Sequence, residues 1–265
     1  MLRIVPMTTE QVLANIRQAH LEEAKRLSFS WRNITELPPE IGQLTHLQSL
    51  SLNCNRLSRL PPDIGRLARL QLLSLHTNHL GNLPPEYWQL DQLSSIDLSN
   101  NELTHLSPEL GRLIHVQSIF AFGNHLHVLP AEIGQLNALT TLSISHNQLT
   151  SIPAEVGRLV NLKALFCHGN KLRAAPAEIG QLQDLETLYL QNNQLEKLPA
   201  EIGSLRNLRV LDVRGNPGNF PELLGELKKQ GDGIYIPRHY PDLPASVLMR
   251  PPWDIDMYLR NEHKW

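Results

Sequence analysis

The sequence predicts an α/β solenoid, an arc or horseshoe with a parallel β-sheet on its concave face and short helices or 3-10 turns on its convex side. Two observations predict it. Asparagines recur at a strict spacing of 23 residues, and leucine dominates the apolar residues while aromatics make up only 5%. Stacked equivalent layers explain both, because each repeat buries the same few side chains against its neighbours. The asparagines are Asn55, Asn78, Asn101, Asn124, Asn147, Asn170, Asn193 and Asn216.

Around each asparagine lies the pattern L-x-x-L-x-L-x-x-N-x-L-x-x-L-P-x-E-I-G-x-L. The best-matching copy has Leu185, Leu188, Leu190, Asn193, Leu195, Leu198, Pro199, Glu201, Ile202, Gly203 and Leu205. A degraded first copy includes Leu27, Phe29, Ile34 and Leu37, with Arg32 in place of the asparagine. We therefore expect nine repeats over residues 24–216, of which the first and last are irregular.

Each part of the repeat predicts one local structure. The L-x-L leucines alternate with polar residues, which is the period of a strand with one buried face. The asparagine amide is expected to turn inward and satisfy backbone groups of the neighbouring repeat. The L-P-x-E-I-G-x-L part places proline and glutamate where a short helix or 3-10 turn begins. Nine strands roughly 4.8 Å apart give a ladder roughly 40 Å long.

The L-P-x-E-I-G-x-L segments resemble the leucine-rich-repeat class of Ras-suppressor and scribble/erbin-type proteins. Plant intracellular Ras-group-related proteins and many bacterial repeat proteins share this class. The resemblance covers about residues 24–220. It implies an arc-shaped fold with a scaffold or recognition role, and it leaves the partner open, because the variable positions recognise partners.

Both ends of an open solenoid must be covered. Residues 1–23 are expected to form an N-terminal cap, with a helix over 8–23 that starts at the T-x-x-Q sequence from Thr8 to Gln11. Its apolar positions are Val12, Leu13, Ile16 and Ala19. A helix that binds a membrane or a partner is the alternative. Residues 217–236 are expected to form the C-terminal cap, with a closing helix from Pro221 and an extended piece over 234–236.

The tail over residues 237–265 departs from the repeat. It contains five prolines before Trp253, which disfavour a helix there. It is also too apolar for a free linker, with Tyr240, Val247, Leu248, Met249, Trp253, Ile255, Tyr258 and Trp265. We expect it to pack back on the last repeat, and a segment for partner binding or self-association is the alternative.

Composition and motifs narrow the function classes. The net charge of −2 with a pI near 6.6 disfavours nucleic-acid or membrane partners. Phosphate-binding, dinucleotide-binding, zinc-protease and serine-hydrolase motifs are absent, so we expect no enzyme and no cofactor. The N-terminus lacks an apolar signal-peptide core, which favours a cytoplasmic location, while specialised secretion into a host cell stays open.

Cysteines and histidines give little evidence for further chemistry. Cys54 and Cys167 lie five repeats apart, roughly 24 Å, so no intrachain disulfide is expected given the limit of ~7 Å between alpha carbons. His76, His146 and His168 map to the concave face, and the last two come from adjacent repeats and could approach one another. No H-x₃-H spacing or neighbouring carboxylate accompanies them, so no metal site is expected.

Candidate binding residues lie at the outward-facing third, fifth, seventh and eighth positions of each repeat. The fifth position is small and polar in the first repeats and holds three aromatics later, and the seventh adds a phenylalanine and a histidine. Grouped exposed aromatics are typical of a recognition hot spot. The alternative is that these rings only stack on each other or tuck inward. The predicted partner-binding residues are Phe120, Phe122, Phe166, His168, Tyr189, Gln191 and Arg214, with Asn100 and Asn192 beside them.

The convex side has an acidic residue at the start of each turn, which helix-start electrostatics explains, with docking of a basic partner as the alternative. Tyr87 and Trp88 replace the Ile-Gly of one copy, and we expect them to form a bump on the outer surface, where they serve a dimer contact or are a tolerated variation.

The sequence therefore predicts a monomeric, non-enzymatic scaffold that binds a protein partner on the later half of its concave face. A bacterial effector that acts on a host protein through the same surface is one alternative. A receptor for a small or peptidic ligand is the other.

Overall fold

A computed structural model of the chain describes residues 6–220 and 223. One α-helix, α1 (Thr9–Leu21), is followed by strands that alternate with 3-10 helices. The strands are β1 (Arg26–Ser28), β2 (Ser49–Ser51), β3 (Leu72–Ser74), β4 (Ser95–Asp97), β5 (Ser118–Phe120), β6 (Thr141–Ser143), β7 (Ala164–Phe166), β8 (Thr187–Tyr189) and β9 (Val210–Asp212). The 3-10 helices are η1 (Pro39–Gln43), η2 (Pro62–Arg66), η3 (Pro85–Gln89), η4 (Pro108–Arg112), η5 (Ala131–Gln135), η6 (Ala154–Arg158), η7 (Ala177–Gln181) and η8 (Ala200–Ser204).

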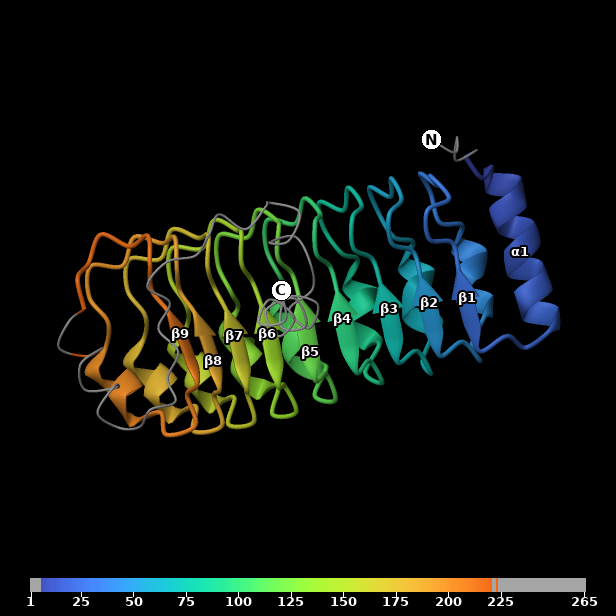
Figure 1. Cartoon of the computed structure of the whole chain (residues 1–265). Helices are drawn as coiled ribbons and strands as arrows, with labels where there is room; N and C mark the ends of the chain where they lie inside the picture. The colour runs from blue at the N-terminus through green and yellow to red at the C-terminus, as the bar shows by residue number, and fades with distance from the viewer. Residues whose placement is uncertain (1–5, 221–222, 224–265) are drawn as a thin grey trace, which may run out of the picture.

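All nine strands form one parallel sheet in chain order, from β1 to β9 (Figure 1). The register advances by one repeat at each step, so that Leu50 pairs with Leu73 and Leu73 with Ile96. Equivalent positions of successive repeats therefore form straight columns across the sheet. The predicted fold class is confirmed, and the open choice between helices and 3-10 turns is settled as 3-10 turns in η1–η8.

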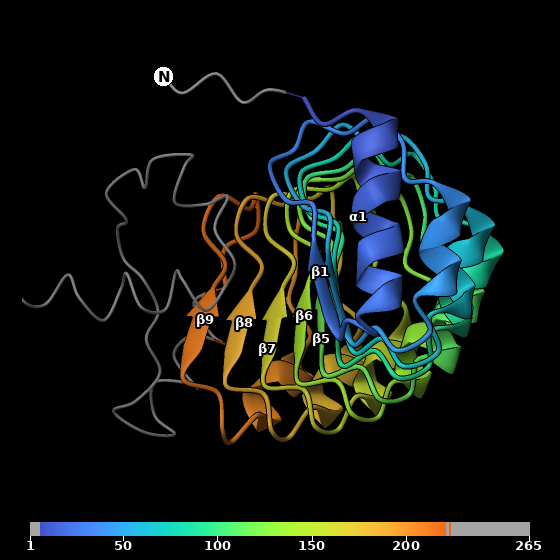
Figure 2. The same cartoon turned by 90° about the vertical axis from the view of Figure 1, so that its right-hand side faces the viewer.

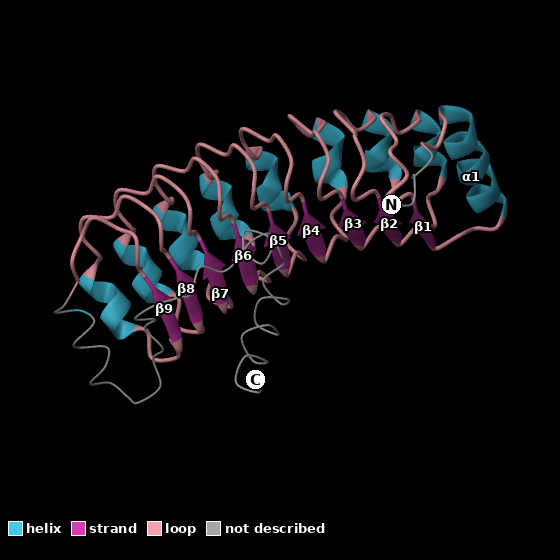
Figure 3. Cartoon of the chain, turned by 45° about the horizontal axis from the view of Figure 1, so that its top comes forward, coloured by secondary structure: helices cyan, strands magenta, loops and turns pink. Residues whose placement is uncertain are grey.

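Strands and 3-10 helices form two layers of an arc. Figure 3 shows the strands along one side and the 3-10 helices along the other. Between the layers runs one continuous apolar core, which extends from Val12 in α1 to Phe220 after the last strand. Because each repeat contributes the same few leucines, the core is a stack of equivalent layers, and removal of a repeat would expose the core of its neighbours.

Helix α1 covers the first repeat, as Figure 2 shows along the axis of the arc. It begins with a complete capping box, in which Thr8 and Gln11 each accept a hydrogen bond from the other's backbone N–H through their side chains. Val12, Ile16 and Ala19 are buried. The helix predicted from the T-x-x-Q sequence is present, and its inner face joins the common core.

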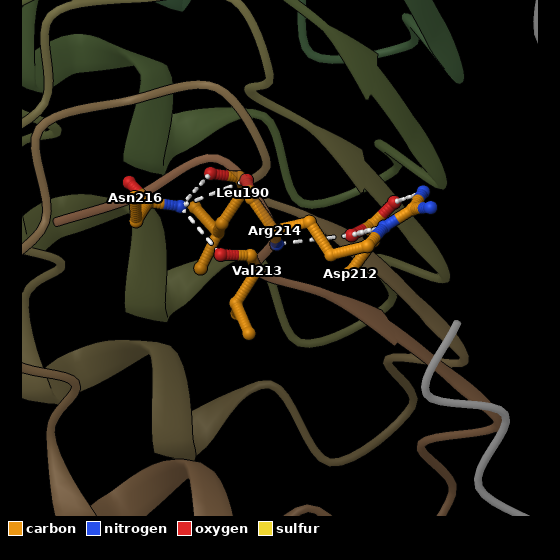
Figure 4. Close-up of polar contacts among 5 residues, drawn as sticks. All are labelled: Leu190, Asp212, Val213, Arg214 and Asn216. Carbon is orange, nitrogen blue, oxygen red and sulfur yellow. Dashed lines mark hydrogen bonds and ion pairs between the residues drawn. The ribbon is translucent and has the colours of Figure 1, made fainter. Parts of the chain in front are cut away.

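The asparagines link the repeats through a ladder of buried hydrogen bonds. Asn147 donates to the backbone carbonyl of Ile144 in its own repeat at 3.1 Å and to that of Ala121 in the preceding repeat at 2.9 Å, and its Oδ1 accepts from the Leu126 N–H at 2.9 Å. Asn216 repeats the arrangement with Leu190 and Val213 (Figure 4). The prediction that these amides satisfy backbone groups of the neighbouring repeat is confirmed.

Replacement of a ladder asparagine should be costly. Asn147→Ala leaves one N–H donor and several carbonyls without their partner inside the core, and we expect the free energy of unfolding to fall by roughly 3–5 kcal/mol. Chemical denaturation monitored by circular dichroism measures this change.

Asn161 supplies the control, because its side chain also donates to a carbonyl of the preceding repeat, that of Asn137, but on the exposed surface. Asn161→Ala should change stability by no more than ~0.5 kcal/mol. Equal effects of the two substitutions would contradict the role assigned to burial.

On the convex side, the E-I-G glycines allow close stacking of successive 3-10 helices. A Cβ atom added to Gly157 would lie 2.6 Å from the backbone oxygen of Glu178 in the next repeat, and Gly134 has the same relation to Glu155 at 2.5 Å. Real Cβ atoms do not approach oxygen that closely, so glycine is required by contact with the following turn.

The prediction that Tyr87 and Trp88 form a bump on the outer surface is wrong. Tyr87 is fully buried, Trp88 is 3% exposed, and their rings meet edge to face with centroids 5.0 Å apart. The physical reason is that these side chains, which replace Ile and Gly, pack within the common apolar core. They therefore cannot serve as an exposed dimer contact.

The glycine requirement can be tested with two alanine substitutions. Gly157→Ala should lower the free energy of unfolding by roughly 1–3 kcal/mol, because the added methyl group forces η6 and η7 apart. Gly81→Ala should leave stability unchanged or raise it by up to ~1 kcal/mol, because no atom lies within 4 Å of the added carbon. Thermal or chemical unfolding of both variants gives the comparison, and a destabilised Gly81→Ala variant would undermine it.

No helix in the described part of the chain is long and apolar enough to span a bilayer. Most of the expected C-terminal cap and the whole tail over 237–265 lie outside the described residues.

Candidate functional site

The columns of the sheet bring the predicted binding residues to one face. In the fifth column, the register pairs Phe120 of β5 with Ser143 of β6, Ser143 with Phe166 of β7, and Phe166 with Tyr189 of β8. Phe120 is therefore separated from the other two aromatics by one serine. The seventh column runs beside the fifth, two residues further along the chain in each repeat. It contains Phe122, Ser145, His168 and Gln191.

Four rings from three successive repeats are in contact, and we call them the concave ring cluster: His146, Phe166, His168 and Tyr189. Phe166 meets Tyr189 edge to face with centroids 5.2 Å apart. His168 lies 6.0 Å from Tyr189 and 5.0 Å from His146, again in edge geometry. Edge-to-face geometry is a favoured arrangement of aromatic pairs. Each such pair stabilises the fold by about 0.5–1.5 kcal/mol in addition to the gain from burying the apolar surface of the rings. The expectation that His146 and His168 could approach one another is confirmed.

The expected exposure of the aromatic residues is wrong for most of them. Phe122, Phe166, His168 and Tyr189 are only 5–8% exposed, and Phe120 is half-buried. Mutual stacking accounts for part of this burial. The predicted aromatic side chains do gather on this face, but their rings are largely shielded from solvent.

Backbone conformation positions His146 within the cluster. His146 and Gly169 occupy the eighth position of adjacent repeats, and both have positive φ, 51° and 66°. A Cβ atom on Gly169 would lie 2.7 Å from the His146 Nδ1, so the imidazole rests directly over the glycine. Glycine at this position thus serves two purposes, the left-handed turn and the space for the neighbouring ring.

The strand face from β5 to β8 has no formally charged side chain at the third, fifth, seventh or eighth position. Charges appear only at its two ends. Asp97 lies on β4, where burial raises the pKa of its carboxyl. Asp212 lies on β9, fully buried, and its carboxylate pairs with Arg214 at 2.5 and 2.9 Å (Figure 4). The centre of the site therefore presents hydroxyl, amide, imidazole and aromatic groups.

Both imidazoles of the cluster are neutral at neutral pH. Burial, and secondly the neighbouring His146, lowers the pKa of His168 to about 3, and burial also lowers the pKa of His146. Within the described part of the chain, His146 Nε2, both ring nitrogens of His168 and the Gln191 Oε1 are buried without a hydrogen-bond partner. Unpaired buried polar atoms cost roughly 1–3 kcal/mol each, so a bound molecule that pairs them would recover that energy.

Acidification should destabilise the fold through His168. The pKa of His168 is lower in the folded state than the ordinary 6.5, so between pH 6.5 and about 3 the unfolded chain binds a proton that the folded chain does not. The free energy of unfolding therefore falls as pH decreases through this window, by up to roughly 5 kcal/mol.

His168→Gln should flatten this part of the stability curve, while His105→Gln removes an exposed imidazole and should leave the curve unchanged. The measurement is denaturant unfolding of the wild type and both variants from pH 7 to 3.5. Parallel curves for the wild type and His168→Gln would show that the imidazole is not held neutral.

The structure divides the predicted site. Phe166, His168 and Tyr189 belong to one contiguous cluster with Gln191 beside it in the seventh column. Phe120 and Phe122 lie in the repeat of β5 and are separated from the cluster by Ser143 and Ser145 of the next repeat. Arg214 is paired with Asp212. His146 and Asp212 were absent from the predicted set. The eighth-column position of His146 was visible in the sequence, but its closure over Gly169 depends on a backbone conformation that the sequence pattern did not reveal.

Other chemistry is sparse among the described residues. They contain no group of three or more histidine, cysteine, aspartate or glutamate side chains that could hold a metal ion. Cys54 and Cys167 are both free, as predicted, and burial raises the pKa of both thiols.

Family profiles match most of the repeat region. The profile described as "Leucine-rich repeat region" matches residues 1–119, and that described as "Leucine Rich repeats (2 copies)" matches residues 137–178 and 183–228. A solved leucine-rich-repeat protein of Leptospira interrogans is 34% identical, with 89% of this chain and 73% of that chain covered and a TM-score of 0.58. The chain belongs to the leucine-rich-repeat family. No curated protein sequence gives a significant match.

Two plant receptor structures are also similar to this leucine-rich-repeat chain. The ectodomain of GASSHO1/SCHENGEN3 from Arabidopsis thaliana, solved in complex with CASPARIAN STRIP INTEGRITY FACTOR 2, is 31% identical with a TM-score of 0.70. The plant peptide hormone receptor RGFR1, solved in complex with RGF2, is 32% identical with a TM-score of 0.67. The alignments with these two receptors cover 79% and 73% of this chain, respectively. This chain spans only 25% and 32% of the length of the two receptor chains. The finer resemblance to the Ras-suppressor and scribble class stays a prediction.

Proposed function

We propose that this leucine-rich-repeat chain is a non-enzymatic interaction module that binds a protein or peptide on its concave face, between β5 and β8. The observation that carries the proposal is the concave ring cluster with its adjoining unpaired imidazole and amide atoms. Aromatic side chains at the centre of a surface, with polar groups around them, are the composition of binding hot spots.

The neutral centre of this face favours an uncharged part of the partner. A charged group placed against Phe166 and the neutral imidazoles would lose its hydration without a counter-charge at the outward-facing positions, where charges appear only at the two ends, as Asp97 on β4 and as the paired Asp212 and Arg214 of the last repeat. A peptide backbone offers alternating donors and acceptors that suit imidazole and amide groups. The two plant relatives were solved with CASPARIAN STRIP INTEGRITY FACTOR 2 and RGF2, the latter on a peptide hormone receptor, which supports this class of partner.

We propose three candidate roles for this module in the cell. A cytoplasmic scaffold and an effector delivered into a host cell would use the same concave chemistry, and a monomer suits both. A receptor for a small or peptidic ligand is the remaining candidate, because the ring cluster is also suited to hold a compact ligand.

Serine substitutions test the site without disturbing the sheet. Serine already occupies the fifth column in β2, β3 and β6, so Phe166→Ser combined with Tyr189→Ser reproduces a residue that this fold accepts. We expect the double variant to lose the partner that the wild type recovers in stoichiometric amount by affinity capture from cells of the source organism. Circular dichroism should remain unchanged.

Trp31→Ser is the matched control, because Trp31 is 61% exposed and lies next to β1, far from the cluster. It should retain the partner. Equal recovery with the wild type and the double variant would reject this site, and recovery of no protein by the wild type would favour the small-ligand alternative.

A further inference from the structure

Four histidines gather along one long edge of the arc, away from the strand face. This edge consists of the turns that follow the ladder asparagines, and its outward positions are the tenth, twelfth and thirteenth of each repeat. His79, His105, His125 and His127 occupy such positions in the third, fourth and fifth repeats, and all four are exposed. The turns lie side by side, because the strands before them pair in register (Figure 1). The four imidazoles therefore share one patch, which we call the histidine edge.

The carboxylates closest to the histidine edge in the sequence are largely engaged. Glu102 lies between His79 and His125 in the tenth column, and its Oε1 is 2.9 Å from the His79 Nδ1. Glu109, four residues after His105, pairs with an arginine of its own turn at 2.6 Å. Glu132 follows His127 by five residues and is half-buried at the start of its 3-10 helix. Protonation of the histidines would therefore leave the patch with an excess of positive charge.

Basic side chains continue the edge on both sides of the histidines. Arg56 lies in the second repeat, and Lys171 and Arg173 lie in the seventh, all of them exposed. Over the first eight repeats the tenth, twelfth and thirteenth positions hold five basic and three acidic side chains, so the formal charge of the edge is +2 with neutral histidines and +6 with all four protonated. The basic residues are Arg56, Arg59, Lys171, Arg173 and Lys197, and the acidic ones are Glu36, Glu102 and Glu196.

We propose that the histidine edge binds an anionic lipid surface in mildly acidic conditions. Histidine is the side chain that gains its charge between pH 8 and 5. A basic side chain close to an anionic leaflet contributes about 1 kcal/mol, or about fivefold in affinity. The charge of the whole chain, −2, does not reveal this edge, because acidic residues recur on the convex side.

Two observations favour a lipid surface over a folded acidic protein. The register advances by one repeat at each step, so side chains of several repeats line up along one edge and can meet the same flat surface together. Val128 follows His127 directly and is 55% exposed, which offers an apolar side chain to the interface between headgroups and acyl chains. The histidine edge is separate from the concave ring cluster, so this proposal does not depend on the proposed function.

Vesicle co-sedimentation of the purified full-length chain tests the proposal. The vesicles contain phosphatidylcholine with about one third phosphatidylserine, or phosphatidylcholine alone, at pH 7.4 and at pH 5.5. We expect binding to the anionic vesicles at pH 5.5, weaker by roughly tenfold or more at pH 7.4, and reversal by 0.5 M salt because the charges are exposed. The variant His105→Gln, His125→Gln, His127→Gln should lose roughly tenfold or more of the affinity at pH 5.5.

A matched control removes three exposed histidines from other surfaces. His46 and His115 lie on the opposite edge and His20 lies in α1, so the variant His20→Gln, His46→Gln, His115→Gln loses the same number of imidazoles. It should keep the wild-type affinity, and circular dichroism at pH 5.5 should show all three proteins folded.

Equal losses in the two triple variants would overturn the proposal, because the net charge of the whole protein would then cause the binding. Equal binding at both pH values would overturn it too, and so would binding to phosphatidylcholine alone. Binding of soluble polyglutamate without binding to anionic vesicles would replace the lipid surface by an acidic polypeptide. None of these results affects the partner-capture experiment with Phe166→Ser and Tyr189→Ser.

Discussion

In every repeat from the second to the ninth, one asparagine side chain joins the backbone of its own strand to the backbone of the strand before it. Asn78 bonds the carbonyls of Leu75 and Leu52, and its own oxygen accepts from the Leu57 N–H. These bonds lie inside the core, away from competing water, where an unpaired backbone group is costly. They fix the distance and the register between repeats, and the positions of the other side chains follow from that register.

One consequence is the straight columns of the strand face. Because Leu142 must pair with Ile119 and Leu165, the side chains that alternate with these leucines are also aligned across the sheet. Phe166 is thereby brought against Tyr189, and His168 against His146, although each pair is separated by more than 20 residues in the sequence. The framework residues build the face, and the variable residues give it its chemistry.

A second consequence appears on the convex side. The fixed spacing brings the backbone of one turn close to the glycine of the turn before it, as at Gly157 and Glu178. In the third repeat Trp88 replaces this glycine, and the indole is buried with Tyr87 in the apolar core. The framework thus accepts one bulky pair, provided that the pair lies within the core, where a sequence pattern alone suggests a surface feature.

The sequence by itself determined the repeat number, the strand positions, the inward asparagines and the free cysteines, because these follow from local periods of two and 23 residues and from spacing along a regular ladder. It also identified Phe120, Phe122, Phe166, His168 and Tyr189 as the unusual residues of the concave face. Only the tertiary structure decided how far those residues are buried, that His146 closes over Gly169, and that Arg214 is occupied by Asp212. The physical reason is that exposure and pairing depend on atoms from other repeats and from beyond the sheet, whereas a periodic pattern specifies only which face of its own strand a residue occupies.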